Sequence, residues 1–404
     1  MLDMQQILAQ AQAHETEMVR FLRELIAIPS ESGEEGRVIQ HIRQEMQNVG
    51  FDEVQLDPMG NLLGRIGHGQ TILAIDAHVD TVGVGNLAQW QHDPYEGKFE
   101  NGIIYGRGAA DQEGALPAMV YAAKIIKDLH LEDDYTLYFV GSVQEEDCDG
   151  LCWQYIINED HLRPECVVIT DSTDCRVLRG HRGRMEIGVT TEGVSCHASA
   201  PERGVNAIYQ MTKIIPEIEK LHTRLNEHAF LGRGTIAVTY IDCQTPSFNA
   251  VPDRCYIHLD RRLTAGDTKD SAVAEVEDAI RRAGVAARVT VPSYNTPSYT
   301  GVVYETEKYF PTWFLERDHH AVHAAVQTYQ RLFNETVAEV GSWVFSTNGV
   351  SIAGRFGIPC VGFGPGKEKH AHSVEDQVAV AQLVKAAAFY AAFPSVYLQQ
   401  QKNR

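Results

Sequence analysis

The chain has 404 residues, of which 44% are hydrophobic and 22% charged, a composition typical of a globular protein with enough core for two or three domains. Lys and Arg number 35 against 54 Asp and Glu, a formal net charge of −19, so the chain is a poor partner for nucleic acid or an anionic membrane surface. No apolar run reaches the roughly 20 residues that span a bilayer, because Gln382 and Lys385 interrupt the best candidate, residues 378–393.

The N-terminus and the cysteines bear on the compartment. The first 28 residues carry polar and charged side chains where a secretory signal needs a continuous apolar segment. Eight cysteines are scattered without a CxxC pair, a pattern typical of free thiols in a reducing compartment. We therefore expect a cytoplasmic protein without a Cys-rich zinc site.

The first part of the chain alternates predicted strands and helices. Ser32 and Glu35 fit a capping box for a helix that Gly50 ends. Several later strand runs are continuously apolar, which is typical of strands covered on both faces. The alternation predicts an α/β fold with a mostly parallel sheet flanked by helices. The predicted strands are 53–56, 62–66, 71–77, 136–141 and 166–170, and the predicted helices are 113–129 and 151–158.

From about Gly183 the order changes to strand, helix, two strands, helix and strand, at 185–191, 206–221, 235–242, 255–263, 268–283 and 285–291. This β-α-β-β-α-β order is that of a ferredoxin-like unit, a self-contained α+β domain. After Pro292 a turn-rich linker leads to a helix at 318–333, a strand at 360–363 and a C-terminal helix. We therefore predict one α/β domain, residues 1–181 and 294–404, interrupted by an inserted domain, residues 182–293.

Acidic residues or histidines follow five of the apolar runs. The carboxyl ends of parallel strands meet at one edge of a sheet, so we expect these side chains to share a crevice. Repulsion among the carboxylates would force some to protonate unless divalent cations lie between them. Nitrogen and oxygen ligands without thiolate favour zinc, manganese or cobalt, and paired metals are a recurrent hydrolytic device. The side chains are His78, Asp80, Asp111, Glu145, Glu146, Asp171, His370 and His372.

Each motif alone has an ordinary structural explanation. A His-x-Asp after a strand is often a polar strand end, paired glutamates are often a solvated turn, and Asp171 is able to cap a helix. The HHAVH segment, residues 319–323, lacks the Glu of HExxH and is predicted as the polar face of a helix. The joint occurrence of the other motifs is what predicts a metal site.

The same motifs carry a family resemblance. HVD at 78–80, GRGAADQEG at 106–114, the paired glutamates, the strand-end Asp171, CHASAPERGVNAI at 196–208, FNAVPDRCYIHLDRRL at 248–263 and GPGKEKHAHSVED at 364–376 occur in family order. From about Ile75 to Asp376 the chain resembles the co-catalytic metallopeptidase family of aminoacylase, acetylornithine deacetylase, succinyl-diaminopimelate desuccinylase, glutamate carboxypeptidase and dipeptidases. The resemblance implies a metal domain interrupted by a dimerisation domain, hence a homodimer.

The resemblance also implies two divalent metal ions per subunit, in the first place zinc, with manganese or cobalt as alternatives. Asp80 would orient His78 through its other ring nitrogen, and Glu145 would be the general base. The implied ligands are His78 and Asp171 for one metal and Glu146 and His372 for the other, with Asp111 bridging both.

Further roles follow from the remaining motifs. His197 would reach a catalytic cleft, in the family typically that of the partner subunit, and stabilise an oxyanion. Asn249 and Arg262 match substrate-contacting positions, with Arg262 as a planar clamp for a carboxylate and Arg261 as the alternative.

The glycine-rich C-terminal motif adds two expectations. Gly364 and Gly366 would let the backbone approach the substrate closely. His370 competes with His372 for the metal, and the family pattern favours His372, which leaves His370 as a solvated loop residue.

Three positions depart from the family pattern and bear on substrate preference more than on the metals. Asp171 resembles the dipeptidase and aminopeptidase branches, since the deacylase and glutamate carboxypeptidase branches tend to carry Glu there. Gln112 follows Asp111 at a position where relatives commonly carry another residue type, and Asn348 stands where many relatives carry Asp. We predict a hydrolase of an amide-type C–N bond, peptide, N-acyl or N-carbamoyl, in a small carboxylate-bearing substrate.

The rival interpretation is a catalytically inactive metal-binding or interaction protein with the same fold. It is disfavoured because the general base and the ligand set are complete. A nucleotide-binding protein is also disfavoured, because no GxGxxG or GxxxxGK[ST] motif follows a strand.

Overall fold

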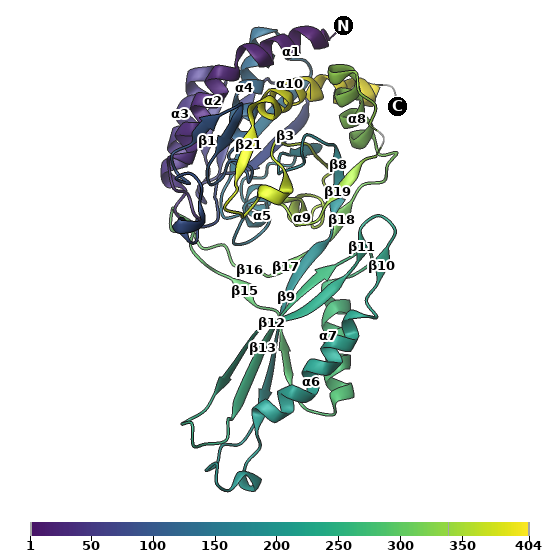
Figure 1. The fold of residues 1–404 in the computed structure, drawn as a ribbon. Helices are drawn as coiled ribbons and strands as arrows, with labels where there is room; N and C mark the ends of the chain where they lie inside the picture. The colour runs from purple at the N-terminus through teal and green to yellow at the C-terminus, as the bar shows by residue number, and fades with distance from the viewer. Residues whose placement is uncertain (1, 338, 403–404) are drawn as a thin grey trace.

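A computed structural model describes residues 2–337 and 339–402. Figure 1 shows two lobes, a larger one that holds both ends of the described chain and a smaller one joined to it by two connections. None of the described helices is both long and apolar enough to cross a bilayer.

The larger lobe is built on a mixed sheet whose centre is parallel. Strands β6, β3, β7 and β20 are mutually parallel, whereas β1, β2 and β18 add antiparallel edges. This confirms the predicted α/β class. The strand order is β1 (Glu53–Leu56), β2 (Leu62–Ile66), β6 (Tyr135–Ser142), β3 (Thr71–His78), β7 (Cys166–Ile169), β20 (Cys360–Gly362), β8 (Leu178–His181) and β18 (Trp313–Phe314), with β19 (Gly341–Trp343) also paired to β8.

Helices cover both faces of this sheet. On one face the core joins α1 (Met4–Ala13), α2 (Glu15–Ile26), α3 (Gly36–Val49), α4 (Ala115–Asp128), α8 (His320–Phe333) and α10 (Val380–Lys402). On the other face lie α5 (Leu151–Asn158) and α9 (Gly349–Ile352). Alternate side chains of β3 enter the two cores, Leu73 and Ile75 on one side and Ala74 on the other, so its apolar run is buried on both faces. A separate small sheet joins segments from the two ends of the domain, in the order β21 (Gln377–Ala379), β5 (Ile103–Tyr105) and β4 (Lys98–Glu100).

The smaller lobe is an antiparallel sheet with two helices on one face. Its strand order is β12 (Thr235–Gln244), β13 (Arg254–Leu263), β9 (Gly183–Glu192) and β14 (Arg288–Thr290). Helices α6 (Ala207–His222) and α7 (Lys269–Ala283) share with these strands a hydrophobic core of their own. The fourth strand of the unit pairs with the first, as in a ferredoxin-like fold. We propose residues 182–293 as the inserted domain on the strength of this separate core.

The chain returns to the larger lobe through short paired segments, β15 (Ser293–Tyr294) with β16 (Thr306–Glu307), and β17 (Tyr309–Phe310) with β9. The described elements that remain are the hairpin β10 (Glu227–His228) and β11 (Gly232–Arg233) and the 3-10 turns Leu87–Gln89, Pro201–Arg203 and Glu368–His370.

One local prediction is wrong. Ser32 and Glu35 do not form a capping box, because α3 begins at Gly36 and neither side chain caps it. The Ser32 hydroxyl instead donates to Asp80 Oδ2 (2.6 Å), and the Glu35 carboxylate accepts from the backbone N–H of Gln144 (3.0 Å). Two polar residues with a capping pattern therefore serve the neighbouring strand ends.

Candidate active site

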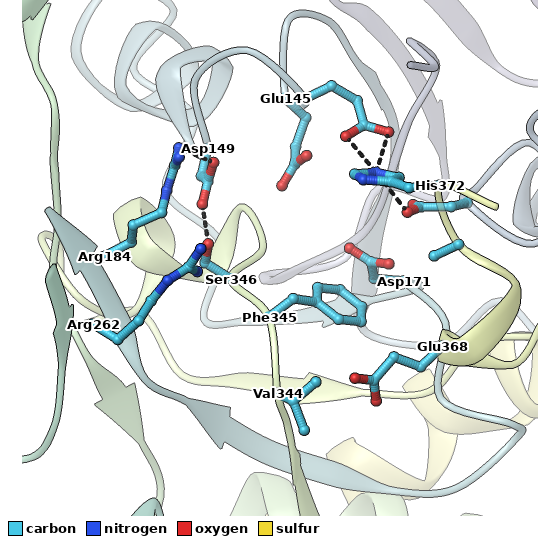
Figure 2. A pocket seen from close by; sticks show the side chains of 13 residues that line it. Glu145, Asp149, Asp171, Arg184, Arg262, Val344, Phe345, Ser346, Glu368 and His372 are labelled. Atoms are coloured by element: carbon cyan, nitrogen blue, oxygen red, sulfur yellow. Dashed lines mark hydrogen bonds and ion pairs between the residues drawn. The ribbon is translucent and has the colours of Figure 1, made fainter. Parts of the chain in front are cut away.

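The predicted polar side chains meet where the parallel strands end. His78 is the last residue of β3, and β6 and β7 lie on either side of that strand. The loop after β5 brings in Asp111. The segment after β20 brings in His372, whose imidazole lies near Glu145 and Asp171 in Figure 2. The side chains that line one pocket together are Asp111, Glu145, Glu146, Asp171 and His372.

Asp111 lies between the two histidines. Its Oδ1 is 3.2 Å from Nε2 of His78, and its Oδ2 is 3.2 Å from Nε2 of His372. His372 Nε2 also lies 2.9 Å from Glu146 Oε2, and His78 Nε2 lies 3.9 Å from Glu145 Oε2. One carboxylate with an oxygen toward each imidazole has the geometry of a bridging ligand between two cations.

Asp80 holds this edge of the sheet in place. It is fully buried, and its carboxylate accepts from the backbone N–H groups of Glu145 (3.1 Å) and Glu146 (3.0 Å). His78 Nδ1 is 2.9 Å from the Asp80 carbonyl oxygen and 3.5 Å from its Oδ1. Asp80 is therefore positioned to fix both the imidazole of His78 and the turn that carries the two glutamates.

Burial and mutual repulsion dominate the electrostatics. Burial raises the pKa of Glu145 and of Asp171 well above the ordinary range, and neighbouring carboxylates raise both further. For Glu146, burial and the Asp111 charge raise the pKa to about 7. Burial also opposes ionisation of Asp111, but hydrogen bonds from the two histidines outweigh it and lower its pKa.

These side chains fit divalent cations. The His372 imidazole lines the pocket together with the carboxylates of Asp111, Glu145, Glu146, Asp149, Asp171 and Glu368. Glu145 Oε1 is buried with no hydrogen-bond partner among the described residues. Within the described chain, one group of His, Cys, Asp or Glu side chains, His78, Asp111 and Glu146, brings its ligand atoms within 4.8 Å of one another. Oxygen and nitrogen donors without thiolate suit zinc, manganese or cobalt.

The pocket extends from the carboxylates to a wall of the smaller lobe. Its volume is about 360 Å³, the size of a small-molecule site. Arg184 of β9 and Arg262 of β13 pair across the two strands and both line it (Figure 2). Arg184 donates to Asp149 Oδ1 (3.0 Å), and Asp149 also accepts from the Ser346 hydroxyl.

The two candidate clamps have different environments. Arg262 is partly exposed at the pocket and is held by Asp260 through two hydrogen bonds of 2.9 and 3.2 Å. Arg261 is fully buried, 3.0 Å from both Asp267 Oδ2 and Glu275 Oε2. The geometry favours Arg262 for contact with a ligand, and Arg261 for holding the smaller lobe together.

A single chain does not bring His197 and Asn249 to this pocket. Both lie beyond the end of β9, whose ten residues run away from the larger lobe over roughly 33 Å. His197 is exposed, pairs with Ala250 as an isolated bridge, and accepts from the Ser199 backbone N–H (3.1 Å).

The structure of the C-terminal motif corrects the expectation for His370. His370 is not solvated but buried, 3.4 Å from the Gln377 amide, and it is not among the residues that line the pocket. A Cβ on Gly364 would lie 1.6 Å from the Thr170 carbonyl oxygen, and one on Gly366 would lie 2.8 Å from that of Ala110. These glycines let the turn pack against the strand ends, and their role in a close approach to the substrate stays a prediction.

Other pocket and supporting residues escaped the sequence reasoning. Arg184, Asp149, Ser346 and Glu368 line the pocket, but nothing in their local sequence distinguishes them from solvated charges. Asp376 accepts from Arg107 and from the backbone N–H groups of Gly108 and Ala110, which fixes the loop before Asp111. The one feature of the sequence that could have pointed to Asp376 is its position four residues after His372.

Two of the departures from the family pattern have structural partners. Thr170 donates to Gln112 Oε1 (2.7 Å). Asn348 donates to Asp76 Oδ2 (2.9 Å) and to the Ser142 hydroxyl (3.0 Å), and its carbonyl accepts from the Gly150 N–H (2.9 Å). The side-chain amide of Asn348 therefore supplies a hydrogen-bond donor to the buried carboxylate of Asp76.

Comparison with known proteins identifies relatives over most of the chain. The family model described as Peptidase family M20/M25/M40 matches residues 74–395. A protein of Escherichia coli (strain K12), described as uncharacterized protein YgeY, is 54% identical over 394 residues, 97% of each chain. A succinyl-diaminopimelate desuccinylase of Legionella pneumophila (strain Corby) is 26% identical over 275 residues, 65% of this chain and 73% of that one.

Solved structures share the fold. Aminopeptidase PepT from Bacillus cereus ATCC 10987 matches with a TM-score of 0.73 at 20% identity, over 95% of this chain and 99% of that one. The Bacillus subtilis YXEP protein, described as a dinuclear metal binding peptidase, matches with a TM-score of 0.72 at 14% identity, over 96% and 99%.

Proposed function

We propose that this chain, which belongs to peptidase family M20/M25/M40, cleaves an amide-type C–N bond in a small substrate bearing a carboxylate. Membership of the family makes the chain a metal-dependent hydrolase of amide bonds. Two divalent cations per subunit, in the first place zinc, would be held by His78, Asp171, Glu146 and His372, with Asp111 between them. The observation that carries this proposal is the Asp111 carboxylate with one oxygen 3.2 Å from each imidazole.

The chain's own residues supply the proton transfer. Bound at this site, the cations would polarise the scissile carbonyl and lower the pKa of the attacking water. Glu145 is buried beside the ligands, and its Oε1 accepts no hydrogen bond from the residues that the structure describes. We assign it the role of general base, which accepts the proton of the water and delivers it to the leaving nitrogen.

Arg262 is our candidate for the substrate carboxylate. Its guanidinium is pre-oriented by Asp260 and lines the pocket on the side of the smaller lobe. A planar guanidinium binds a carboxylate through two parallel hydrogen bonds, so a substrate anchored here would direct its amide toward the metal ligands.

The homodimer belongs to the same proposal. β12 is an edge strand of the smaller lobe, and Tyr240, Ile241 and Phe248 are exposed on it or just after it. Pairing through this region would bury them and carry His197 and Asn249 toward the pocket of a partner subunit. A cytoplasmic location is supported by the eight cysteines, all of which are free thiols.

A substrate panel tests the reaction. We expect the purified protein, loaded with zinc, manganese or cobalt, to hydrolyse members of a set of dipeptides, N-acyl amino acids and N-carbamoyl amino acids. The matched N-methyl amides, which lack the carboxylate, should react at least tenfold more slowly. A metal-loaded protein that cleaves none of the panel would contradict the proposal.

Mixed dimers test the role of His197. Glu145→Gln and His197→Ala subunits are each expected to be inactive alone. Random mixing places half of the chains in heterodimers with one intact site each, so activity should recover to about a quarter of wild type. Absence of recovery, with mixing verified, would show that His197 does not serve the partner's site.

A further inference from the structure

Glu368 is a charged residue of the pocket that has no role in the proposed reaction. It lies in the short turn before His372 and lines the same cavity as the metal-site carboxylates. In Figure 2 its carboxylate lies on the opposite side of the pocket from Arg184 and Arg262, next to Val344. The cavity therefore has guanidinium groups at one side and a carboxylate at the other.

The Glu368 carboxylate is not paired directly with a cation of the described chain. Among the described residues it forms no side-chain hydrogen bond and no ion pair, although its side chain is half-buried. Arg176 is near enough to attract it, but that guanidinium donates to the backbone oxygen of Thr173 (3.2 Å) instead. Burial raises the pKa of Glu368, and the charge of Arg176 offsets only part of this effect.

Three other carboxylates that line the pocket have partners within the chain. Asp149 is paired with Arg184 and Ser346, and Asp111 and Glu146 face the histidines. The neighbours of Glu368 in Figure 2, Val344 and Phe345, are apolar. A partly desolvated carboxylate beside an apolar surface favours a cation strongly, because little water competes for it.

We infer that Glu368 is a specificity-determining residue that binds an ammonium group of the substrate. The inference rests on the proposed function and narrows it: the substrate carries a positive charge in its acyl part as well as a carboxylate in its amine part. Carboxylate at Arg262 and ammonium at Glu368 would place the intervening amide over the metal ligands. Substrates with an amino-bearing acyl group are therefore preferred over simple N-acyl or N-carbamoyl amino acids.

Isosteric substrate pairs isolate the charge. Glycyl-leucine and N-propionyl-leucine differ in an ammonium against a methyl group, and β-alanyl-leucine and N-butyryl-leucine differ in the same way one methylene further out. We expect the wild-type enzyme to favour at least one ammonium member by about tenfold or more in kcat/KM. Glu368→Gln should remove this preference by slowing the ammonium substrate alone.

Two more variants complete the test. Glu375→Gln removes an exposed carboxylate on the same segment but outside the pocket, and it should keep the preference. Glu368→Lys should shift selection toward N-succinyl-leucine, whose acyl group ends in a carboxylate. Circular dichroism and metal content, unchanged in all three, exclude a general loss of structure.

The outcomes separate this inference from the proposed function. If both members of each pair are hydrolysed equally, or if Glu368→Gln slows both alike, Glu368 does not recognise ammonium although the hydrolase proposal stands. If the metal-loaded wild type hydrolyses none of the four, nor any member of the wider panel, the hydrolase proposal fails and this inference falls with it.

Discussion

Replacing Asp80 by Asn should loosen the turn that carries the two glutamates. The Asp80 carboxylate is fully buried and accepts from the backbone N–H groups of Glu145 and Glu146 and from the Ser32 hydroxyl. The two backbone donors reach different oxygens, so whichever oxygen becomes NH2, one buried N–H loses its acceptor. An orphaned donor costs about 1–3 kcal/mol, and the remaining bonds lose their charge assistance.

A local loss of about 2 kcal/mol corresponds to roughly 30-fold faster amide exchange. Hydrogen–deuterium exchange on the metal-free protein, followed by mass spectrometry of a peptide covering 143–148, measures it. Ser32→Ala is the matched control, since it removes one donor and leaves both backbone bonds; a change below about threefold is expected. Peptides from β13 should be unaffected in both variants. Exchange of the 143–148 peptide as slow in Asp80→Asn as in wild type would refute this reasoning.

Three further predictions concern other residues. Glu145→Gln should keep its metal content but lose kcat by about 10²–10⁴-fold, and a normal turnover would exclude it as the base. Asn348→Asp sets a second carboxyl against buried Asp76, whose pKa is already raised by burial. A carboxyl whose pKa is raised in the folded state stabilises the fold below about pH 4, and this stabilisation is lost as the pH rises through the folded-state pKa. The urea midpoint of the variant should therefore fall more at pH 8 than at pH 5, and an equal fall at both pH values would contradict the reasoning. Arg262→Ala should raise KM for carboxylate substrates by about tenfold without unfolding the protein. Arg261→Ala should instead lower the unfolding midpoint, because it leaves the carboxylates of Asp267 and Glu275 without their cation. The reverse pattern would exchange the roles of the two arginines.

Periodicity and chain order predicted much of the scaffold. The strands Glu53–Leu56 and Leu62–Ile66 and the helix Leu151–Asn158 fall at the predicted residues, because apolar runs and glycine turns mark them locally. The gathering of His78, Glu145 and Asp171 followed from one rule, that neighbouring parallel strands end at one edge. Residues at such ends are within reach of sequence reasoning.

Features that depend on tertiary register were out of reach. Arg184 meets Arg262 only because β9 and β13 pair in one particular register. Asp149 and Glu368 sit in charged segments that look solvated in sequence, yet both line the pocket. The family pattern favoured His372 over His370 for the metal, but the burial of His370 was not foreseen. His372 takes a φ of 55° and faces Asp111.

The central claim is that dications lie among the pocket carboxylates, and metal content tests it most directly. Protein purified without chelator should contain about two divalent metal ions per chain by plasma mass spectrometry. Asp111→Asn should lower that number while leaving the fold intact, and a chelator should abolish activity that added metal restores. Full hydrolytic activity in protein stripped of metal would contradict the account.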